Sequence, residues 1–239
     1  MATRNFLYKS EIVINDFISI QVPKVGEILD DNEDTYYNMV QLLTAMPIDM
    51  CVALDDIGID FSKINDYELF LLMFNVFKQC NTKLIFGDFD LSPFELAVKE
   101  STGKVVLLDP NTEREIDRAV QVNIAETLRK LHHLEKNNRK PGNEEARKYM
   151  IERARKKQNR NRRRKHDSQL EDLIVAMVNT EQYKYDFAGT LELSIYQFNE
   201  SVRQVTHKQN YSNLMFGIYS GSLDPKTISQ DDLNWLKHK

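Results

Sequence analysis

One stretch of this chain cannot contribute to a packed core, and it constrains the fold more than any other feature. Residues 155–169 contain no apolar side chain, and nine of the residues in RARKKQNRNRRRKHD (153–167) are Arg or Lys. A segment of such low hydrophobicity and high charge does not fold by itself. The remainder of the chain of 239 residues has an ordinary apolar content. We therefore expect folded parts on both sides of a basic connector.

The basic stretch lies between two acidic parts of the sequence. Residues 143–165 hold 11 basic and 3 acidic groups, whereas the whole chain has a net charge of -4. Its partner could be an acidic protein surface, including that of another copy, or the phosphates of nucleic acid. The candidate contacts are Arg155, Lys156, Lys157, Arg160, Arg162, Arg163, Arg164 and Lys165.

The charge density of this stretch favours nucleic acid, because each neutralised phosphate strengthens binding in a salt-dependent way. However, no Phe, Tyr or Trp on which a base could stack lies between Ala154 and Leu170. No helix-turn-helix or zinc-finger pattern surrounds the stretch. We therefore favour a solvated connector or a contact with protein over a contact with nucleic acid.

Hydrophobic periodicity predicts an α+β fold for residues 1–136. Apolar and polar residues alternate in 10–23 and in 94–110, and turn sequences at Asn15-Asp16 and Ser101-Thr102-Gly103 interrupt these runs. Two hairpins of short antiparallel strands are expected there.

Three stretches in the same part have the three- and four-residue spacing of helices, namely 25–46, 64–80 and 117–135. Asn65 and Glu68 have the spacing of a capping box at the start of the second stretch. Apolar residues nearly surround this helix, so we expect it to be central and buried.

The polar segment NNRKPGN (137–143) predicts a boundary. We divide the chain into an α+β domain (1–136), a polar and basic connector that is partly helical (137–167) and a helical domain (168–239). In the connector, Asn143 can cap a helix whose apolar contacts are Ala146, Tyr149, Met150 and Ile151.

Caps also mark helices in the C-terminal part. Ser168 and Glu171 have capping-box spacing. Ser229 and Asp232 can cap a short terminal helix that places three apolar residues on a surface, namely Leu233, Trp235 and Leu236.

An apolar seam runs through the C-terminal part with helical spacing. Its members are Leu191, Ile195, Phe198, Val202 and Val205. One interpretation is a surface for a client protein or for self-association. The other, which we favour, is the internal core of a helical bundle.

No pattern in the sequence predicts an enzyme or a cofactor site. The acidic runs that begin at Asp30 and Asp88 start like calcium loops, but Thr35 and Pro93 replace the glycine that the turn requires. The glycines are scattered, so no phosphate-binding loop is present.

Metal binding and a membrane span are not predicted either. His132 and His133 are adjacent and project in different directions on a helix, so they cannot chelate one ion together. Cys51 and Cys80 match no metal or redox spacing, and buried thiols in a reducing compartment are expected. No apolar run is long enough for a membrane span or a signal peptide.

Four segments resemble a family of proteins encoded by tailed phages and prophages of gut Firmicutes. They are VGEILDDNEDTYYNMVQLLTAMPIDM, LDDIGIDFSKINDYELFLLMF, SIYQFNESVRQV and SLDPKTISQDDLNWL. Members of this family look like tail assembly chaperones. The resemblance implies a protein in the cytoplasm of the bacterial host that coats the tape measure protein and prevents its aggregation before the tail tube forms.

The resemblance suits a chain without catalytic patterns and with an apolar seam that lacks an assigned partner. We therefore expect a tail morphogenesis protein that acts through protein–protein contacts, with the tape measure protein as partner and self-association as a further contact. Two alternatives remain open, a structural component of the virion and a nucleic-acid-binding protein that uses residues 153–165.

Overall fold

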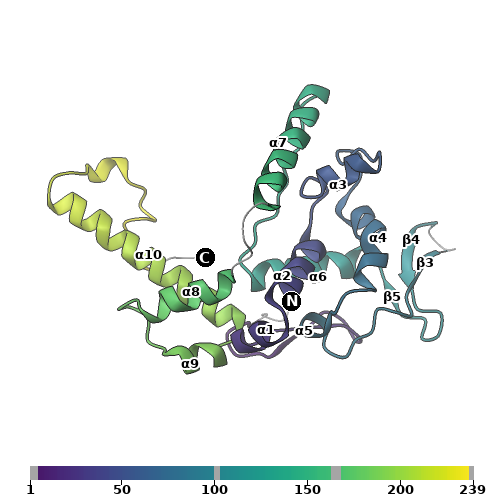
Figure 1. The fold of residues 1–239 in the computed structure, drawn as a ribbon, viewed down its shortest axis with the longest axis horizontal. Coiled ribbons are helices and arrows are strands. Elements are labelled where there is room, and N and C mark those ends of the chain that lie inside the picture. The colour runs from purple at the N-terminus through teal and green to yellow at the C-terminus, as the bar shows by residue number, and fades with distance from the viewer. Residues whose placement is uncertain (1–4, 100–102, 163–167, 237–239) are drawn as a thin grey trace.

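The computed structural model describes residues 5–99, 103–162 and 168–236. Figure 1 shows a central body from which one helix, α7, stands out beside α3, while another, α10, extends as an arm on the opposite side. The structure is mixed, with helices and two small antiparallel sheets, so the predicted α+β class is confirmed. The elements before the basic stretch are β1 (Glu11–Val13), β2 (Ser19–Gln21), α1 (Val25–Asp31), α2 (Glu33–Thr44), α3 (Cys51–Asp56), α4 (Asp66–Phe77), α5 (Lys83–Phe86), β3 (Glu95–Val98), β4 (Val105–Leu108), β5 (Glu115–Ile116) and α6 (Arg118–Leu131).

The elements that follow are α7 (Glu144–Arg162), α8 (Gln169–Val178), α9 (Phe187–Glu192), α10 (Ile195–Tyr219) and the 3-10 turn η1 (Pro225–Thr227).

The first predicted hairpin is present as β1 and β2. The strands pair antiparallel, with Ile12 opposite Ile20, and both side chains are buried. The Asn15 side chain accepts hydrogen bonds from the backbone N–H groups of Phe17 and Ile18, which fixes the turn.

The second predicted hairpin is present as β3 and β4, and β5 extends it to a sheet of order β3-β4-β5. Its register places Leu96 opposite Leu107 and Val98 opposite Val105. These four side chains therefore share one face of the sheet. The predicted turn residues 101 and 102 lie outside the described residues, and Gly103 has a φ of 66°.

The predicted helical stretch 25–46 forms two helices. Asn32 has an extended backbone between them, and its side chain accepts a hydrogen bond from the N–H of Thr35. It is therefore the N-cap of α2, which ends at Thr44 before Pro47. The capping box that starts α4 is confirmed, since Asn65 accepts from the N–H of Glu68 while the Glu68 carboxylate accepts from the N–H of Asn65.

Helices on both sides of the basic stretch share one hydrophobic core. Side chains of α1, α2, α4 and α6 lie in one cluster with those of α8 and the start of α10. The backbone connects them as well, because Val25 N–H donates to Leu193 O over 2.9 Å and Ile195 N–H donates to Pro23 O over 2.8 Å. The Glu33 carboxylate at the start of α2 accepts hydrogen bonds from the Leu170 N–H and the Ser168 hydroxyl at the start of α8.

A second, smaller core fixes α7 to the body. Its buried residues are Cys51, Leu54, Phe61, Leu69 and Ile151. Ile151 and the partly buried Ala154 are the apolar contacts that α7 makes in this cluster. Arg155 adds ion pairs with Asp55 at 3.1 Å and Asp56 at 2.7 Å, both on α3.

The helix α7 continues well into the basic stretch, to Arg162. The predicted helical start is confirmed, because Asn143 accepts a hydrogen bond from the Ala146 N–H. Extending an existing helix costs far less than starting one, so the docked first half can support the polar second half. The ion pair of Lys156 with Glu152, one turn earlier at 2.6 Å, also favours the helical conformation of this part.

The arm formed by α10 packs on the main core through its first three turns, up to Val205. Its fully buried side chains, Ile195, Tyr196 and Phe198, all lie at its start. The C-terminal segment then folds back along the arm, where Gln204 Nε2 donates to Trp235 O over 3.1 Å and His207 Nε2 lies 2.6 Å from Asn234 O.

The predicted terminal helix is wrong for the described residues. Residues 229–233 form a single turn, in which Ser229 Oγ accepts a hydrogen bond from the Asp232 N–H over 3.2 Å. So short a segment cannot offset the cost of helix nucleation without burying an apolar face. Trp235 and Leu236 are exposed, as expected.

Candidate binding surfaces

The apolar seam of the C-terminal part is divided between the core and the surface. Ile195 and Phe198 are completely buried in the main core, and Val202 and Val205 are partly buried against it. Leu191 is partly exposed, at 37%. The buried members are held inside the body, so they offer no surface to a partner in this state.

An exposed apolar face lies instead on α4 and the β3–β4 hairpin. Leu72 and Val76, one turn apart on α4, are exposed. In the hairpin, Leu96, Val98 and Val105 are exposed on the face whose fourth member, Leu107, is buried. Leu107 therefore packs on the body, whereas the other three side chains of this face lie in solvent.

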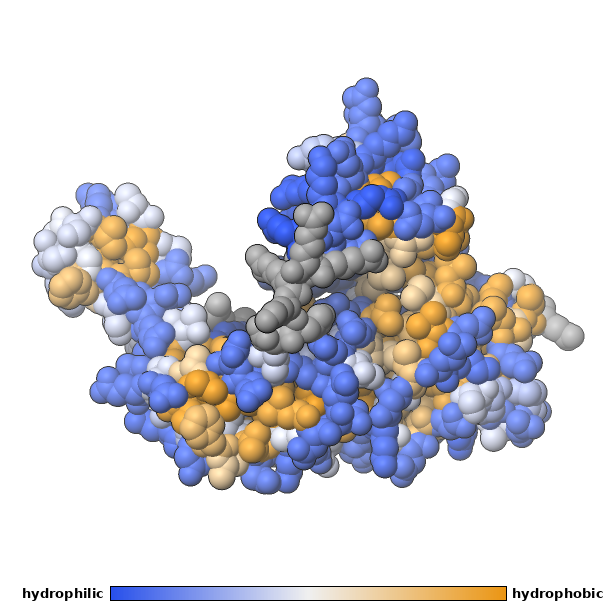
Figure 2. All heavy atoms as spheres, viewed as in Figure 1, coloured by the Kyte–Doolittle hydropathy of each residue, from blue (hydrophilic) through white to orange (hydrophobic). Residues whose placement is uncertain are grey.

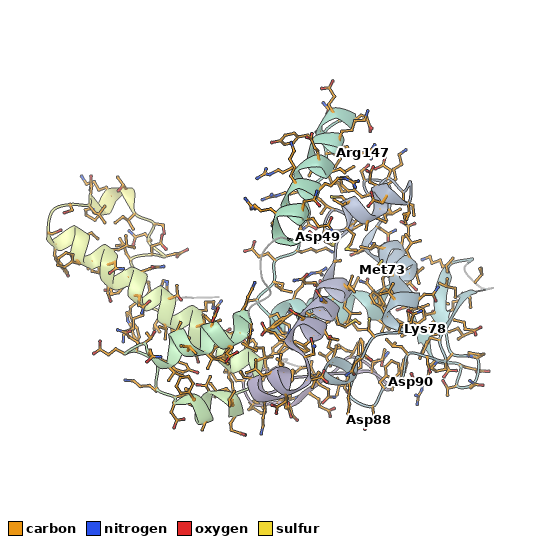
Figure 3. The ribbon with its side chains drawn as sticks, in the orientation of Figure 1. Asp49, Met73, Lys78, Asp88, Asp90 and Arg147 are labelled. Carbon is orange, nitrogen blue, oxygen red and sulfur yellow. The ribbon has the colours of Figure 1, made fainter. Side chains whose placement is uncertain are left out.

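The two parts of this face belong to one side of the molecule. Lys78 at the end of α4 donates a hydrogen bond to Phe94 O over 2.9 Å, just before β3 begins. Figure 3 shows Met73 on α4 and Lys78 just after the end of this helix, near the strands. In Figure 2 a band of apolar residues crosses this side, over α3, α4 and the hairpin. We call Leu72, Val76, Leu96, Val98 and Val105 the α4–hairpin face.

The predicted core helix is present as α4, but one side of it is left uncovered. The helix buries Leu69, Phe70, Phe74 and Phe77, but it leaves Leu72 and Val76 in solvent. The sequence signal for this face was the excess of apolar residues around α4, beyond those that a single buried stripe needs. Periodicity shows such an excess, but it does not show which side stays uncovered.

Further exposed apolar side chains lie in the C-terminal part. Phe187 and Val175 are exposed on α9 and α8, and Phe216 and Tyr219 are exposed near the end of the arm. Within the arm, Leu223 packs against Gly217, where an added Cβ would lie 2.5 Å from a Leu223 methyl carbon. The distal arm therefore has a small packed unit of its own with aromatic rings outside it.

The predicted basic contacts have different surroundings along α7. Arg155 is engaged with Asp55 and Asp56, and Lys156 with Glu152. Lys157 and Arg160 are exposed. The side chain of Arg162, and all of Arg163, Arg164 and Lys165, lie outside what the structure describes.

A cavity of about 280 Å³ lies where the segment after α6 crosses the start of α4. Its buried carboxylate, Asp66, has Lys136 Nζ at 3.1 Å and Arg118 Nη2 at 3.5 Å. Burial alone would raise the pKa of Asp66, but these two cations hold it below its ordinary value. Asp66 is thus a structural counter-ion and is poorly suited to acid–base chemistry at neutral pH.

The buried histidine is also held in one protonation state. Burial lowers the pKa of His132 to about 3, and the Tyr36 hydroxyl lies 2.9 Å from its Nε2. His132 is therefore neutral at physiological pH. Cys51 is buried and Cys80 is partly buried, and both thiols are free.

Within the described ranges, no group of three or more His, Cys, Asp or Glu side chains is placed to hold a metal ion. In the same ranges, no helix combines the length and the apolar character that crossing a membrane requires.

Comparison with protein-family models gives a match for the C-terminal part of the chain. Residues 157–239 match the family model described as the YomV second domain, from a phage-like family named for a protein of a Bacillus prophage. No curated protein and no solved structure matched the chain. The matched part comprises the end of α7, then α8, α9, α10 and the segment that folds back on the arm. The C-terminal part of this chain is therefore similar to a phage-associated domain, which supports a phage or prophage protein.

Proposed function

We propose that this chain is a tail morphogenesis protein of a tailed phage, and that it acts as a non-enzymatic assembly chaperone. Its client is the tape measure protein, which it holds by protein–protein contacts in the cytoplasm of the bacterial host. The similarity of residues 157–239 to a phage-associated domain supports the phage context of this proposal.

The observation that carries the proposal is the α4–hairpin face. Five large apolar side chains from a helix and an adjacent hairpin face solvent there. Exposed apolar side chains gathered on one side of a protein mark a candidate protein-interaction site. An amphipathic helix of a long helical client can bury its own apolar side chains against such a surface.

The proposal is tested by co-expression with the long helical product of the neighbouring gene. We expect a complex that survives purification, and a client that is more soluble with this chain than without it. Finding no complex and no change in client solubility would refute the chaperone function.

A pair of matched variants tests whether the α4–hairpin face makes the contact. Val98 in β3 is 64% exposed and Val13 in β1 is 63% exposed, so lysine at either position adds one charge to a solvent-facing strand residue. We expect Val98→Lys to weaken the complex at least tenfold and Val13→Lys to leave it unchanged. Equal effects of the two variants would exclude this face as the contact.

The alternative of a structural virion component predicts a different location of the protein. A tail or connector component is found in purified phage particles, whereas an assembly chaperone is absent from them. Immunodetection of the chain in purified particles therefore separates the two functions.

A further inference from the structure

The exposed side of α7 carries a ridge of four cations, and among the described residues only Lys156 of these four is paired with an acid. Arg153, Lys156 and Arg160 follow one another at three- and four-residue spacing, and Lys157 lies beside them. All four are exposed. From Arg153 to Arg160 the ridge extends about 10 Å along the helix axis. We call these four residues the α7 ridge.

The ion pairs along α7 leave most of this ridge available. Arg155, on the other side of the helix, is the cation that binds the acids of α3. Arg153, Lys157 and Arg160 form no ion pair with a described residue. The pair of Lys156 with Glu152 is exposed on both sides, and such pairs exchange readily because they contribute little free energy.

The ridge is presented on a fixed support. Ile151 and Ala154 pack in the second core on the side of α7 opposite the ridge, and Arg155 ties the same helix to α3. Arg147, one turn before Ile151, also lies on α7 beside α3 (Figure 3). In Figure 2 the helix forms the most hydrophilic projection of the molecule. Holding a helix in place before binding lowers the entropic cost of ordering its side chains.

An aromatic ring lies in line with the cations. The sequence predicted Tyr149 as a packing contact of α7, but the structure corrects this, because Tyr149 is 63% exposed. It lies one turn before Arg153, and the 4, 3, 4 spacing from Tyr149 to Arg160 keeps the ring and the cations on one side of the helix. Stacking of a base on such a ring is a main contact of proteins that bind single strands.

We propose that the α7 ridge binds the phosphate backbone of single-stranded nucleic acid without sequence specificity, and that Tyr149 stacks against a base. Cations one turn or less apart on a rigid helix match a flexible chain of regularly spaced phosphates. A membrane surface fits less well, because a helix that lies on lipid needs an apolar face opposite its cations and the opposite face of α7 is docked on the body. The inference is independent of the proposed chaperone function, since it uses a different surface.

The test titrates the full chain into three fluorescently labelled probes and measures their anisotropy. The probes are a 20-nucleotide DNA strand, the duplex of that strand, and an RNA of the same sequence. If Arg153, Lys157 and Arg160 each neutralise one phosphate, they contribute about -2 to the slope of log affinity against log salt for a single strand. Between 50 and 200 mM salt this contribution weakens binding roughly 20-fold.

Two triple variants, each of which removes three positive charges, separate the effect of the ridge from the effect of net charge. The ridge variant carries Arg153→Gln, Lys157→Gln and Arg160→Gln. The control variant carries the same change at three exposed lysines elsewhere, Lys9, Lys104 and Lys226. We expect the ridge variant to lose at least tenfold in affinity and about 2 in the salt slope, and the control variant to change affinity by less than threefold.

Tyr149→Ala tests the stacking contact on its own. It should weaken binding of the single strand roughly fivefold or more while changing binding of the duplex little, because bases in a duplex are already stacked. Equal loss with both triple variants, or no salt-dependent binding, would overturn the proposal. Displacement of the oligonucleotide by polyglutamate at equal charge concentration would also overturn it, since the ridge would then be a site for acidic polypeptide.

Discussion

Replacing Ile151 with alanine should release α7 from the body while the main core stays folded. Ile151 is 6% exposed and is the large side chain that α7 buries in the second core. The other attachments include the small side chain of Ala154, the exposed ion pairs of Arg155, and the charge of Arg147 near Asp60 and Asp55. The docking of α7 therefore depends mainly on one residue.

The magnitude follows from the size of the deletion. Truncation of a buried isoleucine to alanine costs about 2–5 kcal/mol. The exposed ion pairs of Arg155 are screened by solvent and cannot replace this loss. Since about 1.4 kcal/mol is a factor of ten, the ratio of undocked to docked α7 should rise by roughly 30-fold or more.

Hydrogen exchange measured by mass spectrometry reports the undocking of α7 directly. Peptides from α7 should exchange much faster in Ile151→Ala than in the unmodified protein, whereas peptides from α6 should keep their protection. The matched control is Ile174→Ala, because Ile174 is 4% exposed but lies in the main core on α8. That variant should lower the melting temperature more than Ile151→Ala does and should not selectively expose α7.

A general loss of stability without selective exchange in α7 would refute the separate attachment of this helix. If Ile151→Ala lowered the melting temperature as much as Ile174→Ala, with no selective exchange in α7, the second core would not be a separable attachment. Helix α7 would then unfold only together with the body.

Three further predictions concern the stability of the body. Because the pKa of His132 is about 3 in the folded state, the unfolded chain binds a proton below about pH 6.5 that the folded chain does not bind, so stability should fall as the pH drops from about 6.5 toward 3. Urea unfolding across this range should show a flatter pH dependence in His132→Gln; an unchanged dependence would mean that other groups cause it. Glu33→Ala removes the acceptor of both bonds from the start of α8 and should cost about 1–3 kcal/mol by thermal unfolding, whereas Glu181→Ala, at an exposed position, should cost little; equal losses would contradict the bridging role. Asn65→Ala should cost about 1 kcal/mol through loss of the α4 cap, and Asn75→Ala, on the exposed side of the same helix, should be neutral or slightly stabilising. Denaturant melts of the two asparagine variants decide this, and a neutral Asn65→Ala would show that packing alone fixes the start of α4.

Local sequence signals located most elements because their physical causes are local. The turn at Asn15 and the capping boxes and caps at Asn65, Asn143 and Ser168 depend on side chains that bond their own neighbouring backbone. Such bonds can be predicted from spacing alone. The break at Asn32 was missed because the apolar periodicity continues across it, although Asn before an acidic turn is itself a cap signal.

Sequence patterns were therefore enough to predict the class of the fold, the places of its hairpins and most helices, and a basic segment without apolar side chains. Long-range packing sets which apolar residues are covered. It buried Ile195 and Phe198 of the seam, left Leu72 and Val98 in solvent, and turned Tyr149 outward beside the α7 ridge. Periodicity defines the faces of an element, but only the neighbours brought by long-range packing determine which face is removed from water.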